Sequence, residues 1–182
     1  MGFRFPLWVD PSLTANTDAD VILNGLRVTS SINNYSDVKS AGDFNGDGKD
    51  DVIVTTSDSV FIFFDGITGT KNTYTDADVI INQSASKYFG SAVSAGDFNG
   101  DGKSDVIVGA HIDENNSGAN SGRALIFFGG ITGTYTDTDA DVILNGQSAD
   151  DGFGVSVASA GDFNGDGKDD VIVGTPWDDN NS

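Results

Sequence analysis

The feature that most constrains the fold is a ten-residue segment, "GDFNGDGKDD" at 42–51, which recurs as "GDFNGDGKSD" at 96–105 and unchanged at 161–170. A second segment, "ADVI" followed by Leu or Ile and then Asn, accompanies each copy, at 19–24, 77–82 and 140–145. Two segments that repeat together in this way are typical of an architecture in which one supersecondary unit is stacked several times. We therefore expect a repeat protein.

Each repeat divides into four short apolar runs separated by Gly, Asn or Asp. The first run leads into the aspartate-rich segment, as in "VSVASAGD" at 155–162, and a Val-Ile-Val run leaves it. The third run is aromatic, "VFIFF" at 60–64 and "ALIFF" at 124–128, and the fourth is the "ADVI" segment. Apolar residues at consecutive positions are typical of strands buried on both faces, as in stacked sheets. We therefore expect the aromatic residues of the third run to lie in the core: Phe61, Phe63, Phe64, Phe127 and Phe128.

The four runs per repeat predict an all-β fold, a β-propeller of four-stranded antiparallel blades with about three blades in this chain. No segment shows helical periodicity, and the 24 glycines suit many tight turns. We expect residues 1–182 to form a single propeller unit. Its parts are strands three and four of a split blade at 1–24, complete blades at 35–82 and 89–145, and strands one and two of a split blade at 153–175. A β-sandwich with a repeated hairpin is the alternative.

The acidic residues of the repeated segment stand at alternating positions. Asp43, Asn45 and Asp47 occupy positions 1, 3 and 5, and Lys49 and Asp51 occupy positions 7 and 9. Like charges this close together repel, and a cation bound between them offsets the repulsion. Side-chain oxygens at positions 1, 3, 5 and 9, with the backbone carbonyl of position 7, are the ligands that Ca²⁺ takes, and they predict about three ions per chain. The equivalent ligands in the other two segments are Asp97, Asn99, Asp101, Lys103 and Asp105, and Asp162, Asn164, Asp166, Lys168 and Asp170.

Three other interpretations of these segments account for them less well. An EF-hand requires a glutamate at position 12, where this chain has Val54, Val108 or Val173. Asx-turns, in which an aspartate caps backbone N–H groups, account for one aspartate per turn but not for this set of side chains in three copies. Mg²⁺ suits the loops less well than Ca²⁺, because it keeps its waters and demands a strict octahedron.

The repeats resemble a known family. A Phe-Gly pair at 153–154 followed by "SVASAGDFNGDGKDDVIVGTP" is similar to the FG-GAP repeat of the integrin α-chain β-propeller and of bacterial FG-GAP and VCBS-like repeat proteins. The second repeat has Phe89-Gly90, one residue closer to its loop, and the first departs most, with Asn34-Tyr35. The resemblance implies four-stranded blades with calcium loops between their first and second strands. It also implies an extracellular or periplasmic, cell-surface module for adhesion, ligand binding or scaffolding.

Charge and composition exclude several other functions. The formal net charge of −19 disfavours nucleic acid and anionic membranes as partners. No apolar run approaches the roughly 20 residues that span a bilayer, and the segment "MGFRFPLWVDPSL" does not match a signal peptide. The chain has one histidine, His111, one glutamate, Glu114, and no cysteine. We expect no enzymatic activity, and we expect His111 to be an exposed loop residue rather than a base.

The sequence leaves the role of the module open between a binder of a protein or glycan ligand and a purely structural, calcium-stabilised fragment of a larger propeller. An accessory domain of a secreted hydrolase is a more remote alternative. The polar insertion at 111–123, together with Trp8 and Trp177, supplies the expected recognition surface.

The two ends of the sequence complement each other. The run "FRFPLWV" at 3–9 precedes "ADVILN" as "ALIFF" does in the complete blade, and Val171–Val173 ends a second-strand run. We therefore expect the split blade to be completed between two copies, which would give a homodimeric six-bladed ring without exposed sheet edges. A fragment of a longer propeller is the alternative.

Overall fold

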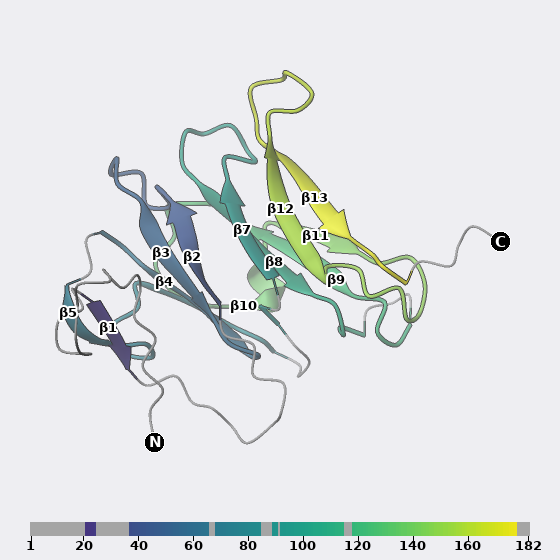
Figure 1. Ribbon diagram of the computed structural model, residues 1–182, viewed down its shortest axis with the longest axis horizontal. Helices are drawn as coiled ribbons and strands as arrows, with labels where there is room; N and C mark the ends of the chain where they lie inside the picture. Colours follow the sequence, from purple (N-terminus) through teal and green to yellow (C-terminus); the bar gives the residue numbers. More distant parts are fainter. Residues whose placement is uncertain are drawn as a thin grey trace, which may run out of the picture.

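The computed structural model describes residues 21–24, 37–65, 68–84, 89–90, 92–114 and 118–177 (Figure 1). These residues form thirteen β-strands and a single 3₁₀ turn, so the expected all-β fold is confirmed. None of the described residues belongs to a helix long and apolar enough to cross a membrane. The run at 3–9 and Trp8 lie outside the described residues.

The strands follow the repeats of the sequence. Their bounds are β1 (Val21–Asn24), β2 (Asp37–Gly42), β3 (Asp51–Thr55), β4 (Ser59–Phe63), β5 (Gly69–Asn72), β6 (Val79–Asn82), β7 (Ala92–Gly96), β8 (Asp105–Ala110), β9 (Arg123–Phe127), β10 (Gly133–Thr136), β11 (Val142–Asn145), β12 (Ser156–Gly161) and β13 (Asp170–Gly174), with the 3₁₀ turn η1 at Asp137–Asp139.

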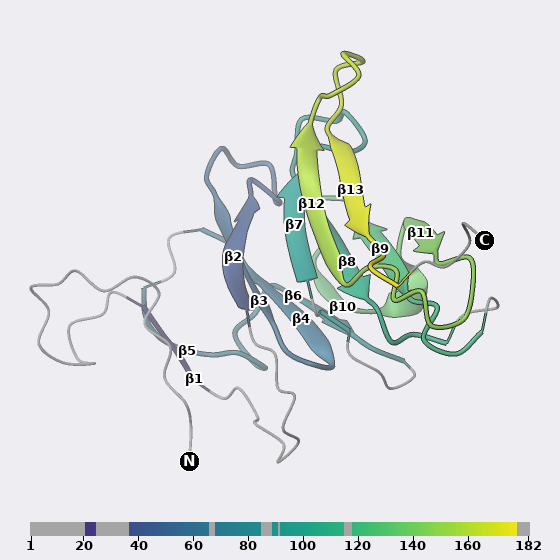
Figure 2. The ribbon, with the colours of Figure 1, turned by 45° about the vertical axis from the view of Figure 1, so that its right-hand side comes forward.

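Two complete antiparallel blades and a further hairpin make up most of the structure. In the first blade the spatial order is β6-β4-β3-β2, and in the second it is β11-β9-β8-β7. The hairpin β12–β13 repeats the arrangement of β2–β3, including a register shift before the last residue of the first strand, at Ser40/Gly42 and at Ser159/Gly161. Figure 2 shows the first strands β2, β7 and β12 following one another across the molecule, and β7 contacts both of the others. This is the arrangement of partial propeller blades.

Two parallel strand pairings were not predicted from the sequence. β10 pairs in parallel with β6, and β5 pairs in parallel with β1. In each case the segment between the third and fourth strands of one blade adds to the fourth strand of the preceding unit. The first blade therefore gains a fifth strand, contributed by the second. We call β5 and β10 the return strands.

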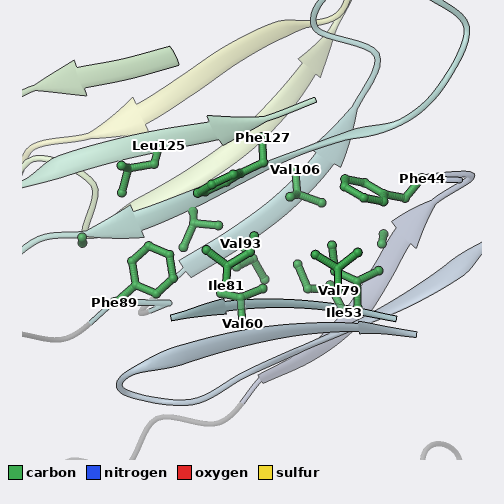
Figure 3. Close-up of a cluster of buried hydrophobic side chains, with 14 residues drawn as sticks. Phe44, Ile53, Val60, Val79, Ile81, Phe89, Val93, Val106, Leu125 and Phe127 are labelled. Carbon is green, nitrogen blue, oxygen red and sulfur yellow. The ribbon is translucent and has the colours of Figure 1, made fainter. Parts of the chain in front are cut away.

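The apolar cores lie between successive sheets. One cluster joins the two blades, and it includes Ile53 and Ile81 of the first and Val106 and Phe127 of the second (Figure 3). A second cluster joins the second blade to the hairpin β12–β13, and a third joins the first blade to Leu23 of β1. Every residue of β4 and β8 is buried. Strands with consecutive apolar residues are therefore covered by a sheet on each face, as their sequences predicted.

The aromatic third strands lie in these cores, as expected. Phe61, Phe63 and Phe127 are buried, and Phe64 and Phe128 are partly buried against the clusters. They anchor the packing between sheets.

Candidate functional site

The three aspartate loops join the first and second strands of each unit, and all three project from the same end of the sheets (Figure 1). The first connects β2 to β3, the second β7 to β8, and the third β12 to β13. The expected position of the loops in the blades is therefore confirmed. The ninth residue of each loop is the first residue of the second strand, so each loop closes a hairpin.

The first aspartate organises its loop by accepting backbone hydrogen bonds. Oδ1 of Asp43 accepts the N–H groups of Gly46 and Asp47, both at 2.9 Å, and Oδ2 accepts the N–H of Gly48 at 2.8 Å. The equivalent aspartates accept the same three bonds, at 2.7–3.1 Å for Asp97 and 2.7–3.0 Å for Asp162. Such bonds to a carboxylate are charge-assisted. The three loops are thus built to one plan.

The glycines at positions 4 and 6 make this plan possible. Gly46 has φ of 82° and Gly48 has φ of 90°, in the left-handed region that residues with a Cβ rarely adopt. These backbone angles turn successive N–H groups toward the first aspartate. The same φ values, within a few degrees, recur at the equivalent glycines: Gly100, Gly102, Gly165 and Gly167.

The aspartate at position 9 links the loop to the rest of its blade. In the first blade Oδ2 of Asp51 accepts the N–H groups of Phe44 and Asn45, and Oδ1 accepts the N–H of Asp65, just after β4. Asp105 accepts the corresponding bonds from Phe98, Asn99 and Gly129. Burial raises the pKa of Asp51 and of Asp105, and these backbone hydrogen bonds oppose the increase only in part.

The other candidate ligands of the loop, Asn45 and Asp47, are polar and accessible, and they too accept backbone hydrogen bonds. Asn45 Oδ1 accepts the N–H of Asp47, and Asp47 Oδ1 accepts the N–H of Lys49. Within the described residues, no group of three or more His, Cys, Asp or Glu side chains is placed to hold a metal ion. The hydrogen bonds present are of the Asx-turn type. A carboxylate has about four lone-pair sites, so after three N–H bonds Asp43 still has capacity to accept another partner.

The donor chemistry of the loops fits a hard cation. Each loop offers carboxylate and amide oxygens, and none of them carries a nitrogen or sulfur ligand. Ca²⁺ takes such oxygens in flexible numbers. Val54, at position 12, lies in the buried strand β3 and supplies no ligand, which agrees with the exclusion of an EF-hand.

A hollow of about 560 Å³ lies at the opposite end of the second blade. Strand β8 runs away from its aspartate loop toward Ala110, and β13 runs in the same sense toward Gly174, so the residues after both strands reach the far end. The hollow is lined by His111, Ile112, Asn120, Ala149, Asp150, Gly152 and Trp177. It brings together two of the expected recognition elements, the insertion after β8 and Trp177. The turn between β11 and β12, which completes it, carried no signal in the sequence.

The expectation that His111 is an exposed loop residue was wrong. Its side chain is half-buried in the wall of the hollow, and burial lowers its pKa. The insertion begins immediately after the buried strand β8, so its first residues remain in the packed part of the blade. Glu114, three residues further, is exposed.

The base of the insertion is fixed by ion pairs. Arg123, the first residue of β9, contacts the carboxylate of Asp113 and that of Asp137, the latter at 2.9 Å. The N–H of Gly122 donates to the carbonyl of Asp113 at 3.1 Å, which closes the neck of the insertion. Asp137 also accepts the N–H of Ser84, after β6, so this cluster ties the insertion to the first blade.

The pKa directions at this cluster follow from burial and pairing. Burial raises the pKa of Asp137, but hydrogen bonds from Ser84 and Arg123 outweigh it and hold the pKa below its usual range. Burial lowers the pKa of Arg123, and the pairs with Asp113 and Asp137 outweigh that effect. Asp137 and Arg123 are therefore both charged at neutral pH.

Known proteins match these repeats. The FG-GAP-like repeat matches residues 43–108, and the FG-GAP repeat matches residues 153–182. Integrin alpha-3 of Mus musculus is 37% identical over 90 residues, which is 50% of this chain and 8% of that protein. Integrin alpha pat-2 of Caenorhabditis briggsae is 30% identical over 158 residues, 76% of this chain and 12% of that protein.

The chain therefore corresponds to a small part of these relatives, 9% in the case of integrin alpha-5 of Xenopus laevis, to which it is 35% identical over 94 residues. The first match includes the first and second aspartate loops, and the second match includes the third. Together with the repeated blades of the structure, they show that this chain belongs to the FG-GAP repeat family and is similar to integrin α chains.

Proposed function

We propose that this chain is a calcium-loaded β-propeller module that binds an extracellular protein or glycan ligand and has no catalytic role. The observation that carries the proposal is the identical construction of the three aspartate loops at one end of the sheets. The same first aspartate accepts the same three N–H bonds in each loop, at 2.7–3.1 Å. A repeated oxygen-rich loop is what a repeated structural cation requires.

In the first loop the ion would be held by Asp43, Asn45, Asp47, the carbonyl of Lys49, and Asp51. The second and third loops supply the equivalent residues. Bound Ca²⁺ would supply positive charge where carboxylates crowd together. The chain's own residues shape the site. The glycines bend each loop, and the aspartate at position 9 ties the first two loops to the residues that follow β4 and β9.

Repetition argues for a structural role of the ions. A catalytic metal site keeps an open coordination position and is served by an acid or base. Here three loops carry one ligand set, and the single histidine, His111, lies in the wall of the hollow at the far end of the second blade. The loops would stabilise the module, and recognition would occur elsewhere.

The hollow beside the insertion is the place we assign to the ligand. Trp177 is 59% exposed, and with Ile112 it offers an apolar surface. Asn120 and Asp150 add polar groups at the rim, joined by a hydrogen bond of 2.7 Å. An exposed indole stacks on flat apolar faces, such as a sugar ring or an aromatic side chain, while polar groups fix orientation.

An extracellular setting agrees with the family and with the proposed calcium dependence. Loops of exposed carboxylates have modest affinity for Ca²⁺. They are therefore occupied only where the ion is abundant, as it is outside cells. The strongly negative charge keeps such a module away from anionic membranes.

Calorimetric titration of metal-free protein tests the proposal. We expect about three equivalents of Ca²⁺, and we expect Asp47→Asn to lose one of them. Asp50→Asn is the matched control, because it removes the same charge at position 8, next to the proposed ligand Asp51 but outside the ligand set. Absence of calcium binding, or equal losses in the two variants, would refute the ligand assignment.

A further inference from the structure

Successive units dock through one repeated set of contacts between their aspartate loops. The N–H of Ser104 donates to the carbonyl of Asp43 at 2.9 Å, and the N–H of Asp169 donates to the carbonyl of Asp97 at 2.8 Å. In both pairs, position 8 of the later loop binds position 1 of the earlier loop. The same two loop positions therefore form the contact at each interface between successive units.

Lysine at position 7 takes part in the same docking. A Cβ added at Gly46 would lie 3.0 Å from the side chain of Lys103, and one added at Gly100 would lie 3.1 Å from that of Lys168. The lysine of each later loop thus covers position 4 of the earlier, acidic loop.

Two apolar positions are buried by the docking. Phe44 at position 2 and Ile53 in β3 are 0% and 1% exposed under the second blade. Phe98 is partly buried against the cluster that joins the second blade to the hairpin, and Ile107 of β8 is fully buried in it. Each unit therefore presents a phenylalanine and an isoleucine to the unit that follows it.

The hairpin β12–β13 presents the same surface, and no unit among the described residues docks on it. Phe163 is 88% exposed and Ile172 is 59% exposed. A Cβ added at Gly165, the counterpart of Gly46 and Gly100, would meet no atom within 4 Å. Large apolar side chains this exposed on one hairpin mark an interaction surface.

The first blade carries the matching half of the interface. Lys49 is the counterpart of Lys103 and Lys168, and Asp50 is the counterpart of Ser104 and Asp169. Instead of covering an earlier loop, Lys49 reaches Asp65 of its own blade at 2.6 Å, with a side chain 65% exposed. The positive Lys49 complements the carboxylates around Gly165, as Lys103 complements those around Gly46.

We propose that the exposed face of β12–β13 docks onto the first blade of a second copy of this chain, head to tail. Asp162 would then accept the N–H of Asp50, and Phe163 and Ile172 would be covered as Phe44 and Ile53 are. Such a heterologous contact closes into a ring when the rotation allows it. The inference does not depend on the ligand or on the hollow, and its failure would leave the proposed function standing.

Cysteine cross-linking tests the docking directly, because the chain has no cysteine of its own. Between the second blade and the hairpin, the N–H of Ser159 donates to Oγ of Ser94 at 3.0 Å. Ser40 holds the equivalent position in the first blade, so Ser40 of one copy would meet Ser159 of the other. We expect a mixture of Ser40→Cys and Ser159→Cys chains to give a disulfide-linked dimer in calcium under mild oxidation. Each variant alone should give little, and absence of cross-linking in the mixture would overturn the proposal.

Light scattering in calcium provides a second measurement. We expect a concentration-dependent mass reaching twice the 18.9 kDa chain, and we expect Phe163→Ser to reduce it to that of the monomer. Ile143→Ser is the matched control, because Ile143 is 42% exposed on β11, outside the docking face. A well-folded monomer at all concentrations, or association that survives Phe163→Ser, would overturn the proposal.

Discussion

Phe44 and Phe163 hold the same position in two identical loops, yet Phe44 is fully buried and Phe163 is 88% exposed. The loops themselves do not account for the difference. The N–H of Phe44 donates to Asp51 at 3.0 Å, and the N–H of Phe163 donates to Asp170 at 2.9 Å. What differs is the unit that follows, because only Phe44 has a blade packed over it. The environment of this residue is thus decided by tertiary stacking and not by local sequence.

Substitution at the two positions should therefore have unequal effects. We predict that Phe44→Ala lowers the free energy of unfolding by about 3–5 kcal/mol, because it leaves a cavity between the blades. Phe163→Ala should change it by no more than about 0.5 kcal/mol in the monomer. Urea denaturation at low protein concentration measures both. Equal losses would contradict the packing described for Phe44.

The loops and the strands around them could be predicted from the sequence, because each depends on a few residues close together. The spacing of Asp43, Gly48 and Asp51 indicates a hairpin loop, and the aromatic runs indicate doubly covered strands. The return strands could not be predicted in this way. Their sequences, "GTKN" and "GTYT", are short and polar, and the stabilising contact comes from another unit. The hollow escaped prediction for the same reason, since three separate connections build it.

Removal of divalent ions should destabilise the module. A ligand that binds only the folded state stabilises it by mass action, and three Ca²⁺ ions would bring the formal charge from −19 to −13 by adding six positive charges. We predict a large decrease in melting temperature when a chelator is added. Sodium chloride should restore it only in part, because screening weakens repulsion without supplying ligands to the loops. An identical melting curve with and without chelator would exclude this role for calcium.

The ion-pair cluster at the base of the insertion should be important for stability. The side chains of Asp113 and Asp137 are 9% and 2% exposed, so removing the cation between them leaves buried carboxylates unpaired. We predict that Arg123→Met costs about 3–5 kcal/mol of unfolding free energy. Lys49→Met, which breaks the exposed pair with Asp65, should cost little by comparison. Thermal and urea denaturation of the two variants give the comparison, and a mild Arg123→Met phenotype would contradict it.

The same cluster predicts a dependence of stability on pH. Burial raises the pKa of Asp137, but hydrogen bonds from Ser84 and Arg123 outweigh it, so the folded pKa lies below the value of about 3.9 typical of an unfolded chain. The stabilisation from its pairing is therefore fully present above that value and is lost as pH falls through the folded pKa. We expect the difference in stability between the wild-type protein and Arg123→Met to be largest near neutral pH and to narrow below about pH 4. Unfolding measured from pH 7 to pH 3 tests this, and a difference that is constant or grows toward low pH would argue against it.

The last prediction concerns the hollow. Trp177 is 59% exposed, so Trp177→Ala should leave the melting temperature nearly unchanged while removing the largest apolar surface of the proposed ligand site. We expect wild-type protein in calcium to bind members of an array of glycans and matrix proteins, and we expect Trp177→Ala to lose those signals. Ile143→Ala, which removes an apolar side chain exposed on β11, should keep them. Wild-type signals that survive chelation and the loss of Trp177 would place recognition elsewhere, and a wild-type protein that binds nothing on the array would favour the purely structural alternative.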